Sequence, residues 1–380
     1  MRHGAERAES AGAHDAAQPW AERAAVAEQA VVTRHLRRVW AIPGTQLGVR
    51  GWPVSMAGRL HTRWNYWWQA HLLDCLTDAQ LRDPQPARAA RIGRLVRGLR
   101  MRNFGSWIND YYDDIAWLGL ALLRASEATG VPVDAALRPV AARLREGWTD
   151  HGGGGIWWRR KDDFKNVPAN GPGAILLARW SRAGGERTDL QRARSMTEWI
   201  ERYLLDQATG LVWDGMHVNP DGTIRDIERT VYTYCQGVFL GACLELAAGD
   251  RSGVWVGRAE RTVGAVAERV AEGGVLPGQG AGDGGLFAGI LARYLALAAL
   301  RLPLLGSTGG AVAAGLVFGS AEAAWRNRAL ARGGPLFGPE WSQPAVSPRS
   351  PRDPRLERDL SVQLGGWMLV EAAALLERTL

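Results

Sequence analysis

Residues 111–129 read YYDDIAWLGLALLRASEAT. Apolar side chains recur at intervals of three and four residues through the second half of this stretch, so it predicts a helix that buries one face. The same periodicity recurs along nearly the whole chain. It predicts twelve helices, at residues 20–39, 63–80, 86–101, 111–129, 133–147, 168–183, 187–206, 229–248, 253–271, 284–301, 308–330 and 358–378.

The connections between these segments differ in length. Some are short links with Gly or Pro, such as 128–132 and 182–185. Others are long and carry aromatic, amide and carboxylate side chains, at 41–62, 102–110, 148–167, 207–228, 272–285 and 331–357. Helical hairpins joined in this way place the long loops at one end of the fold, where long loops tend to be functional. The pattern favours an all-α fold, a closed ring of six helical hairpins, over a parallel α/β sheet.

The composition is that of a chain that folds around a core, with 46% hydrophobic and 22% charged residues in 380. Cys75, Cys235 and Cys243 have neither disulfide-framework nor zinc-ligand spacing, so we expect no metal and no cofactor. No run of eighteen apolar residues occurs, so we expect no integral membrane segment. The net charge of +7 would permit nucleic-acid contact. However, no recognition motif accompanies it, and we expect no nucleic-acid partner.

The two ends of the chain lead to further expectations. Residues 1–23 are charged throughout and lack the apolar core of a secretory signal, so we expect a cytoplasmic protein. We expect residues 1–18 to be a disordered tail and residues 19–380 to form a single domain. Within that domain, the helix at 86–101 carries five arginines opposite its apolar face. This arrangement is typical of a solvated outer helix, with a glycolipid headgroup as the alternative partner.

Three residue types are used unevenly. The chain has 18 tryptophans against 6 phenylalanines and 7 tyrosines, and a broad indole face suits both core packing and stacking on a sugar ring. Only Lys161 and Lys165 are lysines among 46 basic residues, so Lys165 suggests a need for a compact ammonium group. Five of seven asparagines fall in or beside the motifs described below, and amides match sugar hydroxyls because they both donate and accept.

The start of the 111–129 helix is unusual because it concentrates carboxylates. Asp110, Asp113 and Asp114 surround two tyrosines and follow Asn109. One acidic residue would suffice to complement the helix dipole. Adjacent carboxylates can instead flank a ligand that crosses the helix end, and retaining glycosidases use two carboxyl groups about 5–5.5 Å apart. Their proximity also drives their two pKa values apart, which keeps one of them protonated near neutral pH.

In this context the chain, over roughly residues 40–370, resembles glycoside hydrolase family 76, the endo-α-1,6-mannanases. The stretches that carry the resemblance are WNYWWQA at 64–70, YDD at 112–114, GGGGIWW at 152–158, Lys165-Asn166 with Asn170, YCQGV at 234–238, and Asp283 with Phe287 and Ile290. One departure is Cys235, where the family usually has Asn. A thiol is a poorer hydrogen-bond donor than an amide, so one sugar contact is expected to differ.

The resemblance implies an (α/α)6 barrel that hydrolyses α-1,6-mannosidic bonds with retention. It implies that Asp113 is the nucleophile, which forms a glycosyl ester, and that Asp114 is the general acid/base. From the residues and the resemblance together, we expect the carbohydrate substrate to be bound by Asn65, Trp67, Trp68, Gln69, Asn109, Tyr112, Trp157, Trp158, Lys165, Asn166, Asn170, Tyr234, Gln236 and Asp283.

Three other functions stay open at this point. A transglycosylase of the same family would pass the mannosyl ester to a sugar rather than to water. A magnesium-dependent prenyl or terpene enzyme also uses an Asp pair in a helical fold, but Ile115, Ala116 and Trp117 supply none of the further ligands it needs. A non-catalytic glycan-binding protein would not need both Asp113 and Asp114. The sequence leaves open the oligomeric state, endo or exo action, and whether the substrate is free or lipid-linked.

Overall fold

The structure, a computed structural model, describes residues 18–250 and 252–380. The predicted tail at residues 1–18 therefore lies, except for residue 18, outside the described residues. All twelve predicted helices are present. They are α2 (Trp20–His35), α4 (Tyr66–Arg82), α5 (Pro86–Arg102), α6 (Tyr112–Thr129), α7 (Asp134–Glu146), α8 (Val167–Arg182), α9 (Arg187–Leu204), α10 (Thr233–Ala247), α11 (Val254–Arg269), α12 (Phe287–Leu304), α13 (Gly309–Arg326) and α14 (Leu360–Thr379). A further short helix, α3, spans Met56–Arg59.

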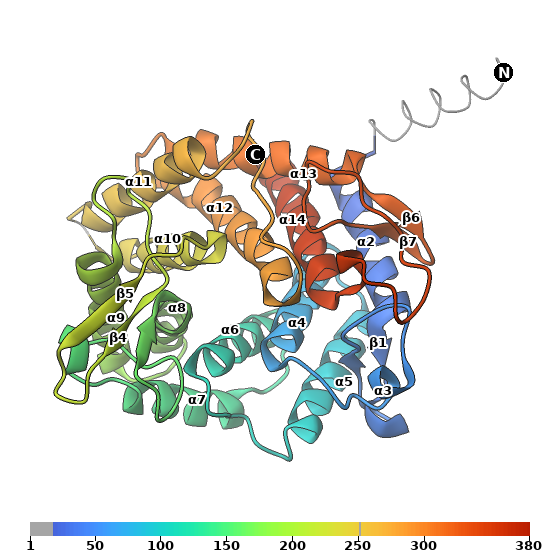
Figure 1. Cartoon of the computed structure of the whole chain (residues 1–380), viewed down its shortest axis with the longest axis horizontal. Helices are drawn as coiled ribbons and strands as arrows, with labels where there is room; N and C mark the ends of the chain where they lie inside the picture. The colour runs from blue at the N-terminus through green and yellow to red at the C-terminus, as the bar shows by residue number, and fades with distance from the viewer. Residues whose placement is uncertain (1–17, 251) are drawn as a thin grey trace.

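The helices form two concentric rings (Figure 1). The inner ring runs α4, α6, α8, α10, α12 and α14, each packed against the next, and α14 returns to α4 and closes it. The outer helices α5, α7, α9, α11 and α13 each pack against the inner helix that precedes or follows them in the chain, and α2 packs against α14. This arrangement confirms the predicted all-α (α/α)6 barrel.

The two rings differ in burial, as their sequences require. Every residue of the inner helix α10 is buried, because that helix has neighbours on all sides. In the outer helix α9 only one face is buried, and its other face carries exposed arginines and glutamates. An all-round apolar helix belongs in a core, whereas a one-sided one belongs at the surface.

Two core helices bear on the expectation of no integral membrane segment. The stretches Gly282–Leu304 and Leu360–Thr379 are long and apolar enough to cross a bilayer. Within the barrel, 72% and 89% of their most apolar windows are buried. Burial of this extent is typical of core helices in a soluble fold, so their apolar character is accounted for by packing.

Short antiparallel strands decorate the long loops. The largest sheet has three strands in the order β3 (Phe164–Asn166), β4 (Gly215–Val218) and β5 (Ile224–Glu228). Two smaller pairs join β1 (Leu36–Arg37) to β2 (Leu47–Gly48) and β6 (Ala329–Ala331) to β7 (Gly334–Leu336). The hairpin of β4 and β5 lies within 207–228, which the sequence predicts only as a loop.

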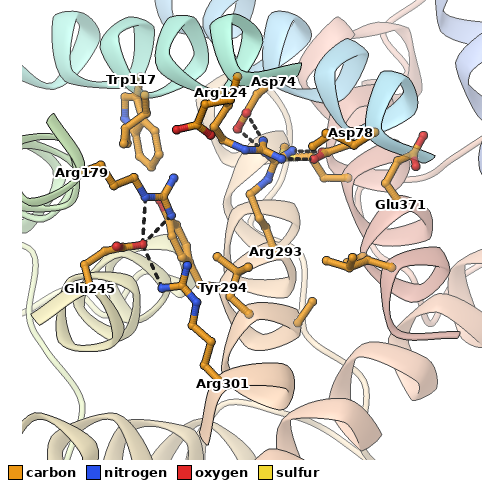
Figure 2. Close-up of a pocket in the computed structure, with 18 of the residues that line it drawn as sticks. Asp74, Asp78, Trp117, Arg124, Arg179, Glu245, Arg293, Tyr294, Arg301 and Glu371 are labelled. Carbon is orange, nitrogen blue, oxygen red and sulfur yellow. Dashed lines mark hydrogen bonds and ion pairs between the residues drawn. The ribbon is translucent and has the colours of Figure 1, made fainter. Parts of the chain in front are cut away.

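At the C-terminal ends of the inner helices lies a cavity of about 490 Å³ that is lined by charged side chains (Figure 2). Arg124 of α6 and Arg293 of α12 each bind both Asp74 and Asp78 of α4. A second cluster, described in the next paragraph, joins α8, α10 and α12. Since carbonyl groups accumulate at helix C-termini, arginines there offset the negative ends of the helix dipoles.

The second cluster centres on Glu245 of α10. Its carboxylate binds Arg179 at 2.8 Å and Arg301 at 3.0 Å (Figure 2). It also binds Arg182. These arginines hold the pKa of Glu245 below its usual range despite burial. These two clusters of paired charges therefore tie neighbouring inner helices together.

Candidate active site

The N-terminal ends of the inner helices surround an open cleft of about 900 Å³ on the opposite side of the ring from the charged cavity. Nine of the sixteen predicted site residues line it: Asn65, Trp67, Asn109, Asp113, Asp114, Trp158, Asn166, Tyr234 and Asp283. The other lining residues are Trp64, Tyr66, Asp110, Tyr111, Trp117, Phe164, Asp214, Tyr232 and Phe287. The cleft is therefore a trench of aromatic rings with carboxylates in its walls.

Asp113 and Asp114 lie in the first turn of α6, where the loop before the helix orients them. The Asn109 side chain accepts a hydrogen bond from the Tyr111 N–H at 2.9 Å, which bends the loop. Its amide nitrogen donates to Asp114 Oδ2 at 2.6 Å. One asparagine thus both shapes the start of α6 and fixes the second carboxyl group.

Asp113 receives two hydrogen bonds. The Trp158 indole donates to its Oδ2 at 3.0 Å, and the Asp114 N–H donates to its Oδ1 at 2.9 Å. Burial raises the pKa of Asp113 to about 7, and these donors oppose the rise because they favour the ionised form.

Asp114 is held closer to its protonated form. Burial and the charge of neighbouring Asp113 raise the pKa of Asp114 well above its usual range, while the Asn109 amide works in the opposite direction. Of the pair, Asp113 therefore has the environment of a carboxylate and Asp114 that of a carboxylic acid.

Asp283 forms a third carboxylate on the facing wall. Its Oδ1 accepts hydrogen bonds from the Trp67 indole at 3.0 Å and the Trp68 indole at 2.8 Å. Trp67 lines the cleft, whereas Trp68 is completely buried. Trp68, predicted as a substrate contact, therefore holds Asp283 from behind.

Asp214 is a cleft residue that the sequence analysis did not select. Burial, together with the charges of Glu228 and Asp113, raises its pKa to about 7. The Cys235 thiol lies 3.9 Å from its Oδ1, which is a weak contact. Asp214 precedes the strand β4, and the missed sheet explains the omission, since a glycine-flanked Asp reads as a turn residue.

The aromatic wall of the cleft comes from different helices. Tyr234 of α10 and Phe287 of α12 stack with ring centroids 3.9 Å apart and planes 12° apart. The ring centroid of Trp67 of α4 lies 6.4 Å from that of Tyr234 and 6.4 Å from that of Trp117 of α6. The sequence shows these aromatic residues at helix starts, but their meeting depends on the closed ring.

Three predicted amide contacts lie outside the cleft lining: Gln69, Asn170 and Gln236. Each is buried and bonds to both the N–H and the C=O of one loop residue. For Gln69 this residue is Gly48, for Asn170 it is Ile156 and for Gln236 it is Val212. Their hydrogen bonds are used to attach loops to helix starts, so they are not free for a sugar.

Lys165 is also placed away from the cleft. Its ammonium group is buried and donates to five oxygens of the glycine-rich loop, at 2.7–2.9 Å. All four glycines at 152–155 in that loop have positive φ. Burial lowers the pKa of Lys165 to about 7. The compact ammonium group of Lys165 therefore binds the interior of this loop and does not reach the cleft.

The last two predicted site residues that do not line the cleft are Trp157 and Tyr112. Trp157 covers Lys165, whose Nζ lies 4.5 Å from the ring centroid. Tyr112 is 6% exposed and packs under Gly147, where an added Cβ would lie 2.6 Å from its ring. Of the adjacent tryptophans in the GGGGIWW motif, only Trp158 therefore reaches the cleft.

Within the described residues, no three His, Cys, Asp or Glu side chains are grouped so that they could hold a metal ion. The cleft is lined by carboxyl, amide, hydroxyl and aromatic groups.

Solved structures share both the fold and the sequence. The chain is 31% identical to the GH76A α-1,6-mannanase from Salegentibacter sp. HEL1_6, with a TM-score of 0.82 that covers 94% of this chain and 99% of that one. A variant of that protein in which two consecutive aspartates are replaced by asparagine is described as inactive and is bound to α-1,6-mannotriose.

Curated proteins match over a shorter stretch. The chain is 28% identical over 162 residues to a putative mannan endo-1,6-alpha-mannosidase of Schizosaccharomyces pombe and to the mannan endo-1,6-alpha-mannosidase DCW1 of Candida glabrata. These matches cover 39% and 38% of this chain but only 36% and 35% of the relatives' lengths.

The family profile gives the broadest match. Glycosyl hydrolase family 76 matches residues 27–353, which include every residue of the cleft. The barrel, the paired carboxyl groups and this match agree. The chain belongs to glycosyl hydrolase family 76 and is a glycoside hydrolase.

Proposed function

We propose that this chain hydrolyses α-1,6-mannosidic linkages with retention of configuration, with Asp113 as the nucleophile and Asp114 as the general acid/base. The observation that carries the proposal is the unequal environment of the two neighbouring carboxyl groups. The named activities of the relatives support the substrate, since both the solved and the curated ones act on α-1,6-linked mannan according to their names.

The hydrogen bonds support the proposed division of roles. A nucleophile must be ionised, and Asp113 accepts from the Trp158 indole and from a backbone N–H. A general acid must hold a proton, and the pKa of Asp114 is raised further because Asp113 lies beside it. This division between a carboxylate and a carboxylic acid is the pattern of a retaining glycosidase.

The reaction would run in two steps. Asp114 donates its proton to the glycosidic oxygen while the Asp113 carboxylate attacks the anomeric carbon, so the bond to the leaving sugar breaks and a glycosyl ester forms. Asp114, now a carboxylate, takes a proton from water. The oxygen of that water then attacks the anomeric carbon, and Asp113 leaves as a carboxylate.

The remaining cleft groups suit the binding of a sugar chain. The rings of Trp67, Tyr234 and Phe287 supply apolar faces, and Asp283 and Asp214 supply acceptors for hydroxyl groups. Asp283 is held on the cleft wall by two indole donors, so its orientation is fixed before a substrate arrives.

The test replaces each carboxyl group and supplies azide as an external nucleophile. Asp113→Ala and Asp114→Ala are incubated with an aryl α-mannoside that has a good leaving group, with and without azide. Loss of the general base leaves the ester to be attacked by azide, so Asp114→Ala should give the α-mannosyl azide. Loss of the nucleophile lets azide attack the substrate directly, so Asp113→Ala should give the β-mannosyl azide.

A matched control is Asp134→Ala, since Asp134 also lies in the first turn of a helix, α7, but is exposed and lies outside the cleft lining. This variant should keep turnover of α-1,6-mannooligosaccharides, while both cleft variants lose it. If Asp113→Ala gave the α-mannosyl azide and Asp114→Ala gave the β-mannosyl azide, the two roles would be reversed. Undiminished hydrolysis by either cleft variant would show that the proposal is wrong.

A further inference from the structure

Positive charge is concentrated in two stretches of the chain near one side of the barrel. Residues 29–73 and 84–109 contain twelve arginines and no aspartate or glutamate. In the fold, Arg34 is buried against the Pro335 carbonyl, and Arg88 and Arg91 lie at Glu28. The other nine of the twelve have no carboxylate partner within the part of the chain that the structure describes. Such a concentration of unpaired positive charge attracts polyanions or anionic surfaces.

Apolar loop tips project from the same region. They are the loop 40–44 (WAIPG), the turn 56–60 of α3, and Phe104 after α5. Phe104 is 86% exposed and Met56 72%. Trp40 and Phe104 are the two aromatic residues among the exposed large hydrophobics of the described residues. We call these three tips, together with Arg97, Arg100 and Arg102, the basic apolar face.

The backbone holds these side chains outward at a cost. Outside glycine, positive φ occurs in the described residues at five positions: Trp40, Ala41, His61, Phe104 and Lys161. Four of these lie in or next to the basic apolar face. A bulky residue in this conformation is strained, and such strain tends to accumulate where function requires it. Trp40 and Phe104 lie at loop tips, where the fold does not bury them.

The three tips form one continuous surface. The Trp40 indole donates to the Leu60 carbonyl at 3.0 Å, and Arg102 Nε donates to the His61 carbonyl at 3.0 Å. The Arg102 guanidinium also lies 5.7 Å from the Trp40 ring centroid and 5.1 Å from that of Trp64. Trp64 lines the cleft, so the basic apolar face adjoins it.

The arginines of α5 attach the other tips. Arg97 Nε donates to the Gly44 carbonyl at 2.9 Å, and Arg100 Nε donates to the Gly105 carbonyl at 3.1 Å. In Figure 1 the helices α3 and α5 and the strand β1 accordingly lie side by side on one side of the ring. Each apolar tip is therefore flanked by guanidinium groups.

We propose that the basic apolar face docks on an anionic lipid bilayer. Arginines supply attraction to negatively charged headgroups, and Trp, Phe, Leu and Met side chains can enter the boundary between headgroups and acyl chains. A nucleic acid or another soluble polyanion would use the arginines but gain nothing from the exposed aliphatic side chains of Met56 and Leu60. This docking would bring the mouth of the cleft next to the membrane surface.

The test is flotation of the full chain with vesicles of phosphatidylcholine alone and of equal parts phosphatidylcholine and phosphatidylglycerol. Wild type should float with the anionic vesicles, less so as salt rises, and not with the neutral ones. Each arginine near an anionic surface contributes about fivefold in affinity, so Arg97→Glu with Arg100→Glu should lose about 25-fold or more. Phe104→Ser should lose about tenfold, because its ring no longer enters the interface.

Matched controls carry the same changes elsewhere on the surface. Arg138→Glu with Arg187→Glu reverses two exposed arginines on α7 and α9, and Leu304→Ser removes a side chain that is 85% exposed. Circular dichroism and thermal unfolding check that every variant folds. The proposal is overturned if wild type stays unbound, binds both vesicles equally, or is weakened as much by the control changes. Retention on heparin without vesicle binding would instead identify a site for soluble polyanions.

Discussion

The Trp158 indole gives the sharpest test of how the cleft controls its nucleophile. Trp158→Phe keeps an aromatic ring but removes the N–H that donates to Asp113 Oδ2 at 3.0 Å. A hydrogen bond to a charged group contributes about 1.5–3 kcal/mol. At about 1.4 kcal/mol per pKa unit, its loss should raise the pKa of Asp113 by about 1–2 units.

The sign of the effect on activity follows from the role of Asp113. A nucleophile with a raised pKa needs a higher pH to ionise, so the acidic limb of the kcat/KM profile should move upward by about 1–2 pH units. Below that limb, kcat/KM should fall by about 10–100-fold. The basic limb should move less, because it reports the proton on Asp114 and the indole donates to Asp113.

The measurement is kcat/KM for an α-1,6-mannooligosaccharide across the pH range in which the protein stays folded. Trp157→Phe is the matched control, since the neighbouring indole covers Lys165 instead of reaching the cleft. Its acidic limb should stay at the wild-type position. An acidic limb that stays in place or moves to lower pH in Trp158→Phe would refute this account of Asp113.

Three further predictions concern folding stability. Lys165→Met leaves the oxygens of the glycine-rich loop without their donor, so the free energy of unfolding in urea should fall by at least about 3 kcal/mol. Glu245→Gln should cost about 1.5–3 kcal/mol at neutral pH, because it removes the buried carboxylate that Arg179, Arg182 and Arg301 bind. In wild type this contribution is present above the unfolded-state pKa of Glu245 and is lost as pH falls through its lowered folded-state pKa. Because the pKa of Asp214 is raised to about 7, the folded state keeps a proton that the unfolded chain releases above about pH 4. Stability therefore falls as pH rises between these values, by about 4 kcal/mol from Asp214 alone. Asp214→Asn should lose this share of the fall in pH-dependent denaturation, while the share from Asp113 and Asp114, whose pKa values are also raised, remains.

The helices could be predicted from the sequence because their signal is local. Each has apolar residues at intervals of three and four and is bounded by Gly or Pro, so all twelve were placed within a few residues. Errors of a few residues at the helix starts matter for function, because the starts line the cleft. The segment predicted from residue 63 begins as a helix at Tyr66, which leaves Trp64 and Asn65 in extended chain on the cleft wall.

The strands could not be predicted in the same way. β4 and β5 are four and five residues long, and β4 pairs on its other side with β3, about fifty residues earlier in the chain. Such a short strand has too few residues to establish alternation. Asp214 directly precedes β4 within the segment 207–228, which the sequence predicts only as a loop, yet Asp214 lines the cleft.

The inner helices show why the sequence alone predicts Gln69, Asn170 and Gln236 as sugar contacts although they hold loops. Gln69, Asn170, Gln236 and Gln363 are each the fourth residue of an inner helix. Each pairs with the N–H and the C=O of a single loop residue, at 2.8–3.1 Å. A buried backbone requires such partners, and an amide is the side chain that can donate and accept at once.

The pairing of buried backbone groups and the binding of sugar hydroxyls therefore both favour an amide side chain. The partners of these amides are backbone groups of loops that lie 14–26 residues away in sequence, so no local pattern distinguishes an amide that holds a loop from one that binds a hydroxyl. The two kinds are nevertheless linked. By fixing the loop against the first turn of its helix, each amide sets the direction of the residues just before that turn. For α4 and α8 these residues are Asn65 and Asn166, which do line the cleft.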